Sequence, residues 1–341
     1  MTPLKPEYLP DLNWMPLPAL LVGYDRHLVA FNRQFEDMFP SANVGLDMSM
    51  VIRDPGFLDA IDRVVHTNER LTSNFSTKGQ AERHFTSYIQ PLVGYDDLLI
   101  ISLYETTKAY ESERMRSTFV ADVSHELRSP LTTMIATLET LKGRAGEDKA
   151  TRDRFVDMTA AEAGRMHRIV NDLLALSATE ARKHITPSER VSLKPILESI
   201  IKLVRERAAQ KGMTVQADIA SDLPAIAGET DQLTQVFQNL IDNAINYGDR
   251  STDLKIRLFR DAAKNMQGVS VTNFGNVISP DHIPRLTERF YRVDSSRSRH
   301  LGGTGLGLAI VKHILGRHKG RLSVESSEES GTIFTVYLPE K

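Results

Sequence analysis

The chain has 341 residues, and 42 lysines and arginines against 44 aspartates and glutamates leave a formal net charge of −2. This length suggests two or three domains, and the balanced charge gives no support to bulk nucleic-acid binding. Because the sequence contains no cysteine, disulfide scaffolds, cysteine-ligated zinc, iron–sulfur clusters and cysteine nucleophiles are excluded.

No segment of the sequence predicts a membrane span or an export signal. The apolar stretches at 17–22 and 98–103 are far shorter than the roughly 20 residues that cross a bilayer. The first residues also lack a basic segment followed by an apolar core. The sequence therefore predicts a cytoplasmic protein without a transmembrane segment, and peripheral attachment to the inner membrane through another protein stays open.

Residues 1–105 predict a mixed α/β domain. The apolar run 19–24, a turn at 25–27 and a second run at 28–31 are typical of a hairpin. Residues 32–39 predict a helix, and 81–91 and 98–104 predict strands. None of these residues has catalytic spacing. A domain that binds a small ligand or a partner and a plain packed core are both compatible with this pattern.

Residues 106–185 predict a helical hairpin. Apolar residues recur at helical spacing in two runs, 131–141 and 155–176, and turn residues at 143–148 separate the runs. A single hairpin leaves one apolar face uncovered, so we expect a second copy of the chain to complete a four-helix bundle. The alternative is that this face packs against neighbouring domains of the same chain.

Residues 190–341 alternate predicted helices and strands after a linker at Pro187 and Ser188. The predicted helices are 193–211, 229–247 and 304–318, and the predicted strands are 213–219, 254–259, 269–272, 321–326 and 332–338. Helices grouped against a mostly antiparallel sheet form an α+β layer fold.

His125 stands out among the ten histidines because of its neighbours. Asp122, Glu126 and Ser129 lie at helical offsets around it, and Pro130 predicts a kink beside it. An exposed imidazole next to a carboxylate is set up as a nucleophile, since the carboxylate holds the ring proton on one nitrogen and leaves the other lone pair free. A surface histidine without a function is the alternative interpretation.

A glycine-rich loop at 301–309 leads into the last predicted helix. Glycines let a backbone approach phosphate oxygens, and a helix N-terminus presents free amides. The preceding segment, 285–299, has only two acidic residues, Glu288 and Asp294. It carries five arginines, at positions 285, 289, 292, 297 and 299. This combination predicts a mobile lid over a polyanion. The alternative is a surface turn beside solvated charges.

Amide side chains line one face of the helix predicted at 229–247. Asn239 and Asn243 are four residues apart, and Asn246 follows three later. Amides are poor helix formers, but their oxygens can ligate a magnesium ion that is carried by nucleotide phosphates. A polar helix face without a ligand is the alternative.

Taken together, these segments resemble the sensor histidine kinases of two-component systems, in order, over roughly residues 110–341. The matching motifs are the phosphoacceptor box (122–130), the asparagine box (235–247), the phenylalanine box (288–293) and the second glycine box (302–307). The amino-acid sequence of 289–294 and 302–314 is most similar to that of phosphate-regulon sensor kinases. Residues 15–105 resemble a PAS sensory domain.

The resemblance implies a multidomain α+β chain with three parts. These are a PAS-like domain (1–105), an antiparallel dimerisation and phosphotransfer hairpin (106–185) and an α/β sandwich ATPase domain of the gyrase, Hsp90 and histidine-kinase type (190–341). It also implies the reaction. The γ-phosphoryl group of ATP, with Mg²⁺, is transferred to a histidine and then to an aspartate of a response-regulator receiver domain. The implied partners are therefore a second copy of the chain and a response regulator.

Carried over residue by residue, the resemblance makes His125 the phosphoacceptor, Glu126 its orienting base and Asn243 the magnesium ligand. Arg292 and the glycines should face the phosphates, and Ser129 occupies the position at which related kinases assist dephosphorylation. The implied nucleotide-binding residues are Asn239, Asn243, Tyr247, Asn273, Gly275, Gly303, Thr304, Gly305, Leu306 and Gly307.

The sequence departs from the family pattern at several positions. Asn273 and Val277 stand where the first glycine box has an aspartate and a glycine. Gln235 replaces a common glutamate, Asn246 a lysine, and Ser129 a threonine or asparagine. These changes motivate an alternative function, a catalytically weak kinase-like adaptor. A plain gyrase-like ATPase is a third possibility, but it does not account for the Ser-His-Glu segment.

Overall fold

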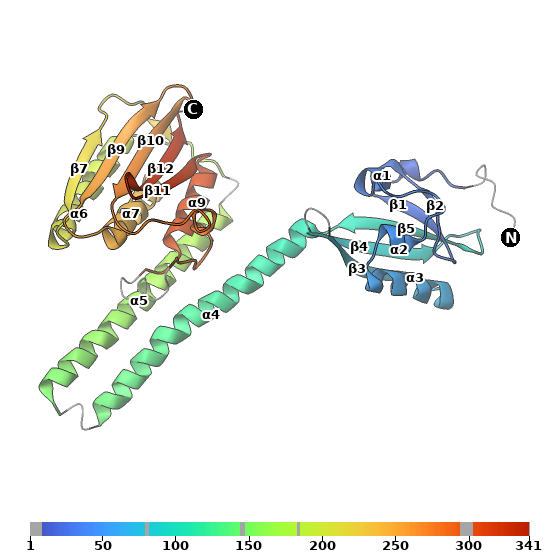
Figure 1. Cartoon of the computed structure of the whole chain (residues 1–341), viewed down its shortest axis with the longest axis horizontal. Coiled ribbons are helices and arrows are strands. Elements are labelled where there is room, and N and C mark those ends of the chain that lie inside the picture. Colours follow the sequence, from blue (N-terminus) through green and yellow to red (C-terminus); the bar gives the residue numbers. More distant parts are fainter. Residues whose placement is uncertain (1–8, 79–81, 144–146, 183–184, 294–302, 341) are drawn as a thin grey trace. The chain divides into compact units, whose positions relative to one another are not determined.

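We describe the protein from a computed structural model that covers residues 9–78, 82–143, 147–182, 185–293 and 303–340. The chain divides into two compact units, residues 1–120 and 121–341, and each is described by itself (Figure 1). Asp294, Arg297 and Arg299 from the predicted lid, and Gly302 from the second glycine box, lie outside the described residues.

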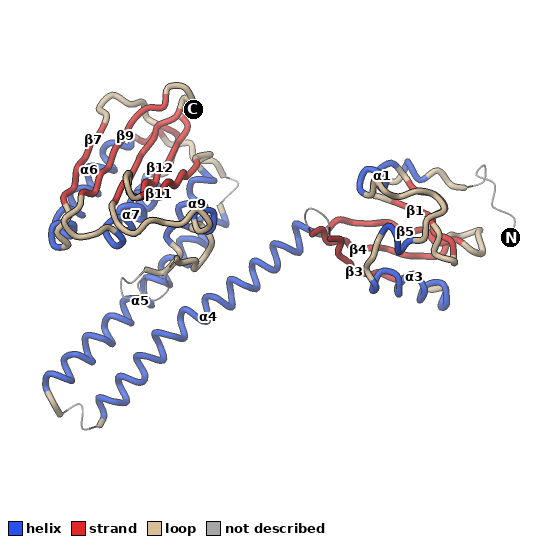
Figure 2. Tube along the Cα trace, in the orientation of Figure 1, coloured by secondary structure: helices blue, strands red, loops and turns tan. Residues whose placement is uncertain are grey.

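The first unit contains a five-stranded antiparallel sheet with the order β2-β1-β5-β4-β3 (Figure 2). Its strands are β1 (Ala19–Gly23), β2 (Leu28–Phe31), β3 (Leu71–Lys78), β4 (Glu82–Pro91) and β5 (Leu98–Glu105). Its helical elements are η2 (Leu12–Trp14), α1 (Arg33–Met38), α2 (Met48–Val51) and α3 (Pro55–Thr67). The predicted α/β domain is confirmed. Sequence patterns did not reveal α3 or β3.

Phenylalanine rings fill the interior of this unit. Phe75 and Phe85 stack with their centroids 5.2 Å apart, and Phe57 lies 4.7 Å from Phe75. Phe35 is fully buried in the same apolar cluster. Aromatic side chains contribute large buried areas and specific packing. The structure therefore favours the packed-core interpretation of this interior.

Polar side chains cap the helices of this unit. The Asp54 carboxylate accepts a hydrogen bond from the Phe57 amide at 3.1 Å, and Pro55 occupies the first turn of α3. This combination satisfies an amide left free at the helix start and pre-sets its backbone. Asn32 is completely buried, and its side-chain oxygen accepts from the amides of both Ala19 and Phe35. Asn32 thereby joins α1 to β1.

The end of β5 is tied to the start of the following helix, α4 (Thr107–Lys142). Glu105 pairs with Arg83 at 2.6 Å and accepts a hydrogen bond from the Thr107 hydroxyl at 2.9 Å. One turn later the Tyr110 ring stacks on His84, with the ring centroids 3.7 Å apart. The first turn of α4 is thus fixed to β4 and β5.

Helix α4 and helix α5 (Lys149–Ala181) form the predicted antiparallel hairpin (Figure 1). The Asp148 carboxylate caps α5 by accepting from the Thr151 amide at 2.8 Å. Pro130 lies inside α4, which continues without interruption from Thr107 to Lys142. Proline can occupy such a position although it removes one backbone donor.

A second five-stranded sheet follows, with the order β11-β12-β10-β9-β7. Its strands are β7 (Thr214–Ile219), β9 (Asp253–Asp261), β10 (Met266–Asn273), β11 (Arg321–Ser327) and β12 (Gly331–Pro339). Only β7 pairs in parallel, with β9, so the prediction of a mostly antiparallel sheet is confirmed. The short strands β6 (Arg190–Val191) and β8 (Ile226–Ala227) form a separate pair.

Three helices pack against this sheet: α6 (Leu193–Gln210), α7 (Thr230–Tyr247) and α9 (Gly307–Arg317). A short 3-10 helix, η4 (Ile283–Arg285), precedes the glycine loop. Alternate residues of β9 are buried, namely Leu254, Ile256 and Leu258. This period of two is expected for a sheet with one face against the core.

His318, directly after α9, is a buried histidine that supports the start of α7. Its Nδ1 donates to the Ile314 carbonyl at 2.8 Å, so its Nε2 accepts from the Glu229 amide at 3.1 Å. Burial is the main reason that its pKa is lowered. The folded chain therefore binds a proton less readily than the unfolded chain. The stabilisation is complete above the unfolded pKa of about 6.5 and is lost as the pH falls below it.

We expect the midpoint temperature of unfolding to be lower at about pH 5.5 than at about pH 7.5, because protonated Nε2 can no longer accept a hydrogen bond. Thermal unfolding followed by circular dichroism measures this shift. His318→Gln keeps a neutral acceptor and should flatten the pH dependence. Equal pH dependence of the two proteins would contradict the assignment.

Among the described residues, no helix is long and apolar enough to cross a lipid bilayer.

Candidate functional site

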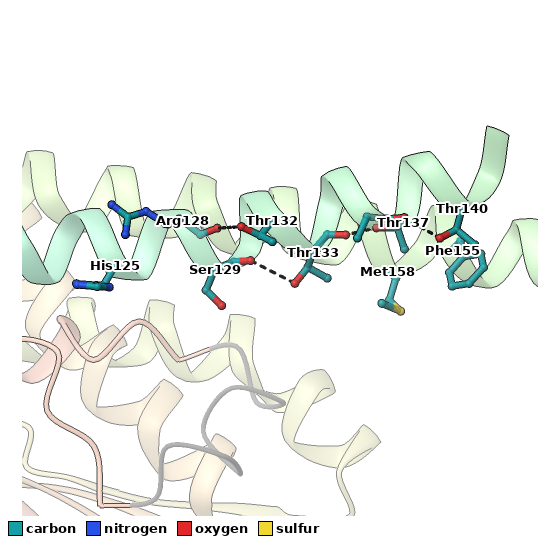
Figure 3. A pocket seen from close by; sticks show the side chains of 10 residues that line it. His125, Arg128, Ser129, Thr132, Thr133, Thr137, Thr140, Phe155 and Met158 are labelled. Atoms are coloured by element: carbon teal, nitrogen blue, oxygen red, sulfur yellow. Dashed lines mark hydrogen bonds between the residues drawn. The ribbon is translucent and has the colours of Figure 1, made fainter. Parts of the chain in front are cut away.

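The site is built from the part of α4 that follows Val120, from α5 and α7, and from the loop before α9, all of which belong to the second unit. On α4, His125 is exposed and lies at one end of a groove of about 660 Å³ between α4 and α5. Figure 3 shows His125 and Ser129 leaving α4 on the same side, toward this groove. The imidazole is therefore accessible to a reacting partner.

Threonines form much of the α4 wall of the groove (Figure 3). The hydroxyls of Thr132, Thr133 and Thr140 donate to backbone carbonyls one turn earlier, at 2.9, 3.2 and 2.7 Å. Their protons are thus used within the helix. The imidazole of His125 is a nucleophilic group of the groove, and the Ser129 hydroxyl lies in the same groove.

Glu126 points away from the groove, toward arginines. Its Oε2 accepts from Nη2 of Arg165 on α5 at 2.6 Å and lies 3.5 Å from Nη2 of Arg292. Consecutive residues on a helix do not face each other, which is why Glu126 and His125 separate in this way. The predicted contact between Glu126 and the His125 ring stays a prediction.

The asparagine face of α7 meets the glycine-rich loop. Asn239 Nδ2 donates to the Gly307 carbonyl at 3.3 Å, at the first residue of α9. Asn243 follows one turn later and is half-buried, whereas the adjacent stripe containing Leu240 and Ala244 is fully buried. The amides therefore lie at the edge of the core. An amide oxygen there fits the oxygen ligation that magnesium requires.

The glycine-rich loop approaches the backbone of the phenylalanine box so closely that a side chain on Gly305 would collide with it. Gly305 has φ +76, and a Cβ on it would lie 2.8 Å from the Phe290 Cα. The Phe290 amide donates to the Gly305 carbonyl at 2.9 Å, and Arg292 donates to the Gly303 carbonyl. The structure thus brings Arg292 and the second glycine box together, and the prediction that both face phosphates stays a prediction. A glycine-lined backbone of this kind fits phosphate oxygens.

The altered first glycine box lies where β10 ends, beside the C-terminus of α7. Asn273 is buried, with only 4% of its surface exposed. A Cβ on Gly275 would lie 2.4 Å from the Tyr247 carbonyl oxygen, so glycine is required by this close approach. Val277 is 43% exposed. Of the residues that the resemblance assigned to the nucleotide base, Gly275 therefore lies next to Tyr247.

Two carboxylates of α5 contact the phenylalanine box, the second glycine box and α9. These contacts were not predicted from the sequence. Asp172 accepts a hydrogen bond from the Thr304 hydroxyl at 2.6 Å. Glu180 pairs with Arg289 and lies 3.4 Å from His313 Nε2. A signal for Asp172 was present, because it lies between buried Ile169 and Leu176 at helical spacing. Charged residues that interrupt an apolar stripe indicate such contacts.

Desolvation is the main reason that the pKa of Asp172 is raised, and the hydrogen bond from Thr304 opposes it. When ionised, Asp172 adds negative charge where phosphates are expected. Asp172→Asn should therefore strengthen binding of a magnesium–ATP analogue by about threefold to tenfold, measured by calorimetry. Asp157→Asn, at an exposed position of the same helix, is the matched control. Unchanged or weaker binding in Asp172→Asn would show that this carboxylate does not compete with phosphates.

No cluster of three or more metal-ligating His, Cys, Asp or Glu side chains is present in the part of the chain that the structure describes.

Residues 115–182 match the family described as "His Kinase A (phospho-acceptor) domain". Residues 228–341 match the family "Histidine kinase-, DNA gyrase B-, and HSP90-like ATPase". The fold and the site thus define an ATP-binding domain joined to a phospho-acceptor hairpin.

Proteins with similar sequences include a bacterial sensor protein and a bacterial sensor protein kinase. The chain is 36% identical over 297 residues to the phosphate regulon sensor protein PhoR of Pseudomonas aeruginosa, covering 86% of this chain and 65% of PhoR. It is 35% identical over 266 residues to the sensor protein kinase WalK of Staphylococcus epidermidis, covering 78% of this chain and 42% of WalK. The chain belongs to the two-component sensor histidine kinases. It spans less than two thirds of the length of either relative.

A solved structure has a similar fold. The histidine kinase ThkA, in complex with the response regulator protein TrrA, matches with a TM-score of 0.55 and 20% identity over 96% of both chains.

Proposed function

We propose that this chain is an ATP-dependent protein-histidine kinase with His125 as the phosphoacceptor. The observation that carries the proposal is the Glu126–Arg292 contact, because it brings the phosphate-binding loop next to the residue that follows His125. An exposed imidazole and a glycine–arginine cradle in one unit are the two halves of a phosphoryl-transfer site. Membership of the histidine kinases favours this function over a catalytically weak adaptor.

In the proposed reaction, an imidazole nitrogen of His125 attacks the γ-phosphorus of ATP. A nitrogen–phosphorus bond forms, the bond to the bridging oxygen breaks, and ADP leaves. Arg292 and the amides at the start of α9 neutralise charge on the transferring group. Asn243 would hold a magnesium ion, which supplies further neutralisation when bound. Because His125 is exposed, water can accept the ring proton that remains on the imidazole.

We propose an aspartate of a response-regulator receiver domain as the second acceptor. The family and the ThkA–TrrA complex support this choice. The similarity to PhoR supports a role in phosphate-type signalling. Ser129 lies one turn after His125, in the same groove, where its hydroxyl can orient a water for dephosphorylation.

We also propose that the hairpin forms a homodimeric four-helix bundle. Leu131, Ile135 and Leu138 of α4 are 46–49% exposed, and they lie on one face at helical spacing. Val170 and Leu174 of α5 are also exposed. Apolar faces of this kind are typically covered by a second copy. Light scattering of the purified chain should give the mass of a dimer.

The N-terminal domain is proposed to act as a PAS-like sensory domain. The contacts of Glu105, Thr107 and Tyr110 support this role, since they attach the sheet to the helix that carries His125. A shift in the sheet would therefore move the start of α4.

Incubation of the purified chain with magnesium and γ-labelled ATP tests the kinase. The expected product is a labelled protein whose label is stable to alkali and labile to acid, and His125→Gln should carry none. Sustained ATP hydrolysis without phosphoprotein in either protein would instead indicate a gyrase-like ATPase.

A further inference from the structure

Arg165 is a buried arginine in the middle of α5, and its side chain is only 7% exposed. Charged side chains are almost never buried to this extent unless they are paired. Arg165 lies four residues before the buried Ile169, on the apolar face of the helix. Solubility does not account for an arginine at a buried position of this kind.

The contacts of Arg165 are markedly unequal. Its Nη2 donates to Oε2 of Glu126 at 2.6 Å, whereas its Nη1 lies 4.0 Å from Oε2 of Glu162. Its Nε and the Glu162 Oε2 are both buried and have no hydrogen-bond partner within the described residues. The guanidinium is therefore directed to Glu126, although its remaining donors are not fully used.

Glu126 in turn connects Arg165 to the nucleotide-binding loop. The same Oε2 atom lies 3.5 Å from Nη2 of Arg292, and Arg292 donates to the Gly303 carbonyl. A continuous series of contacts thus runs from α5 through α4 to the glycine loop. It passes through the residue directly after His125.

We propose that Arg165 is a positioning residue for phosphoryl transfer. It fixes the Glu126 carboxylate, so that Arg292 and the phosphate-binding loop approach His125 in one orientation. Arg165 itself does not touch the reacting atoms. This inference rests on the proposed kinase function and adds to it a residue on the second helix of the hairpin.

The chemistry of the side chain explains the choice of arginine. A guanidinium is planar and always charged, and it holds a carboxylate in a defined direction. Without it, Glu126 would be free to rotate toward water or to hold Arg292 in other geometries. Misalignment of groups near the reacting atoms lowers the rate of transfer more than it lowers substrate affinity.

The first test compares single-turnover autophosphorylation of wild type, Arg165→Met, Arg165→Lys and Arg154→Met. We expect Arg165→Met to lower the rate constant at least about tenfold while the KM for ATP changes less than about twofold. Arg165→Lys keeps the charge and should restore part of the rate. Arg154, exposed on the same helix, is the matched control and should react at the wild-type rate.

The second test is a double-mutant cycle with Glu126→Gln. If Arg165 acts through Glu126, Arg165→Met should slow the Glu126→Gln protein no further, because the two changes remove one interaction. Additive losses would overturn the proposal and indicate a purely structural role. So would a wild-type rate in Arg165→Met. Circular dichroism and light scattering confirm that each variant is folded and has the wild-type mass.

The two levels of the proposal fail differently. If the kinase function is wrong, the wild-type chain itself carries no phosphohistidine. If only the role of Arg165 is wrong, the wild type is labelled, and either Arg165→Met is labelled equally fast or the losses in the double-mutant cycle are additive.

Discussion

Replacing Gly305 by valine is expected to weaken nucleotide binding strongly. Gly305 has φ +76, a conformation that costs other residues about 1–2 kcal/mol. The new Cβ would also lie 2.8 Å from the Phe290 Cα and 2.9 Å from its carbonyl carbon. Backbone atoms cannot move aside as a flexible side chain can, so the loop must leave its position. Calorimetric affinity for a magnesium–ATP analogue should fall at least about tenfold, with autophosphorylation lost in parallel.

Gly316→Ala is the matched control for this change. Gly316 lies in α9 of the same segment, with nothing within 4 Å of its added Cβ. Alanine is favoured over glycine in a helix by about 1 kcal/mol, so this protein should bind nucleotide normally and be slightly more stable. Wild-type affinity in Gly305→Val would mean that the glycine loop does not hold the phosphates.

Asn273→Asp is expected to strengthen ATP binding by about tenfold. The carboxylate would accept a hydrogen bond from the adenine amino group with charge assistance, which makes such bonds about twice as strong. Because Asn273 is 4% exposed, the same carboxylate should destabilise the nucleotide-free chain. Calorimetry with an ATP analogue measures the first effect, and thermal unfolding without nucleotide measures the second.

Asn276→Asp, three residues later at an exposed position, controls for the added charge alone. If Asn273→Asp binds ATP no better than wild type, residue 273 does not contact the adenine amino group. Absence of label on the native chain, with label restored by Asn273→Asp, would instead support the weak-adaptor function.

The periodicity of the sequence predicted most elements of the second unit. The helix predicted at 229–247 is α7 (Thr230–Tyr247), and the strands predicted at 321–326 and 332–338 are β11 and β12. The buried residues of α7 recur at helical spacing, so burial leaves a repeating pattern in this part of the chain. The first unit was harder. Strand β3 carries polar residues on much of its length, and its pattern is correspondingly weak.

The order and spacing of the motifs also determined the family, since phosphoacceptor, asparagine, phenylalanine and glycine boxes are local runs of residues. Local backbone chemistry such as the glycine requirement at 305 follows from such runs. The partners of the charged side chains do not. Glu126 was expected to serve only its neighbour His125, yet in the structure it pairs with Arg165 and Arg292, which are 39 and 166 residues away.

Only the tertiary structure decided which charges are buried and which face water. In the sequence, Asp172 interrupts an apolar stripe of the predicted helix, but nothing local shows what Asp172 or Arg165 contacts. Packing of α5 against α9 and of Glu126 against α5 removes them from solvent. The free energy of a charge depends on its surroundings rather than on its neighbours in the chain. The contacts that connect α5 and Glu126 to Arg292 and the glycine-rich loop were therefore visible only after the chain was folded.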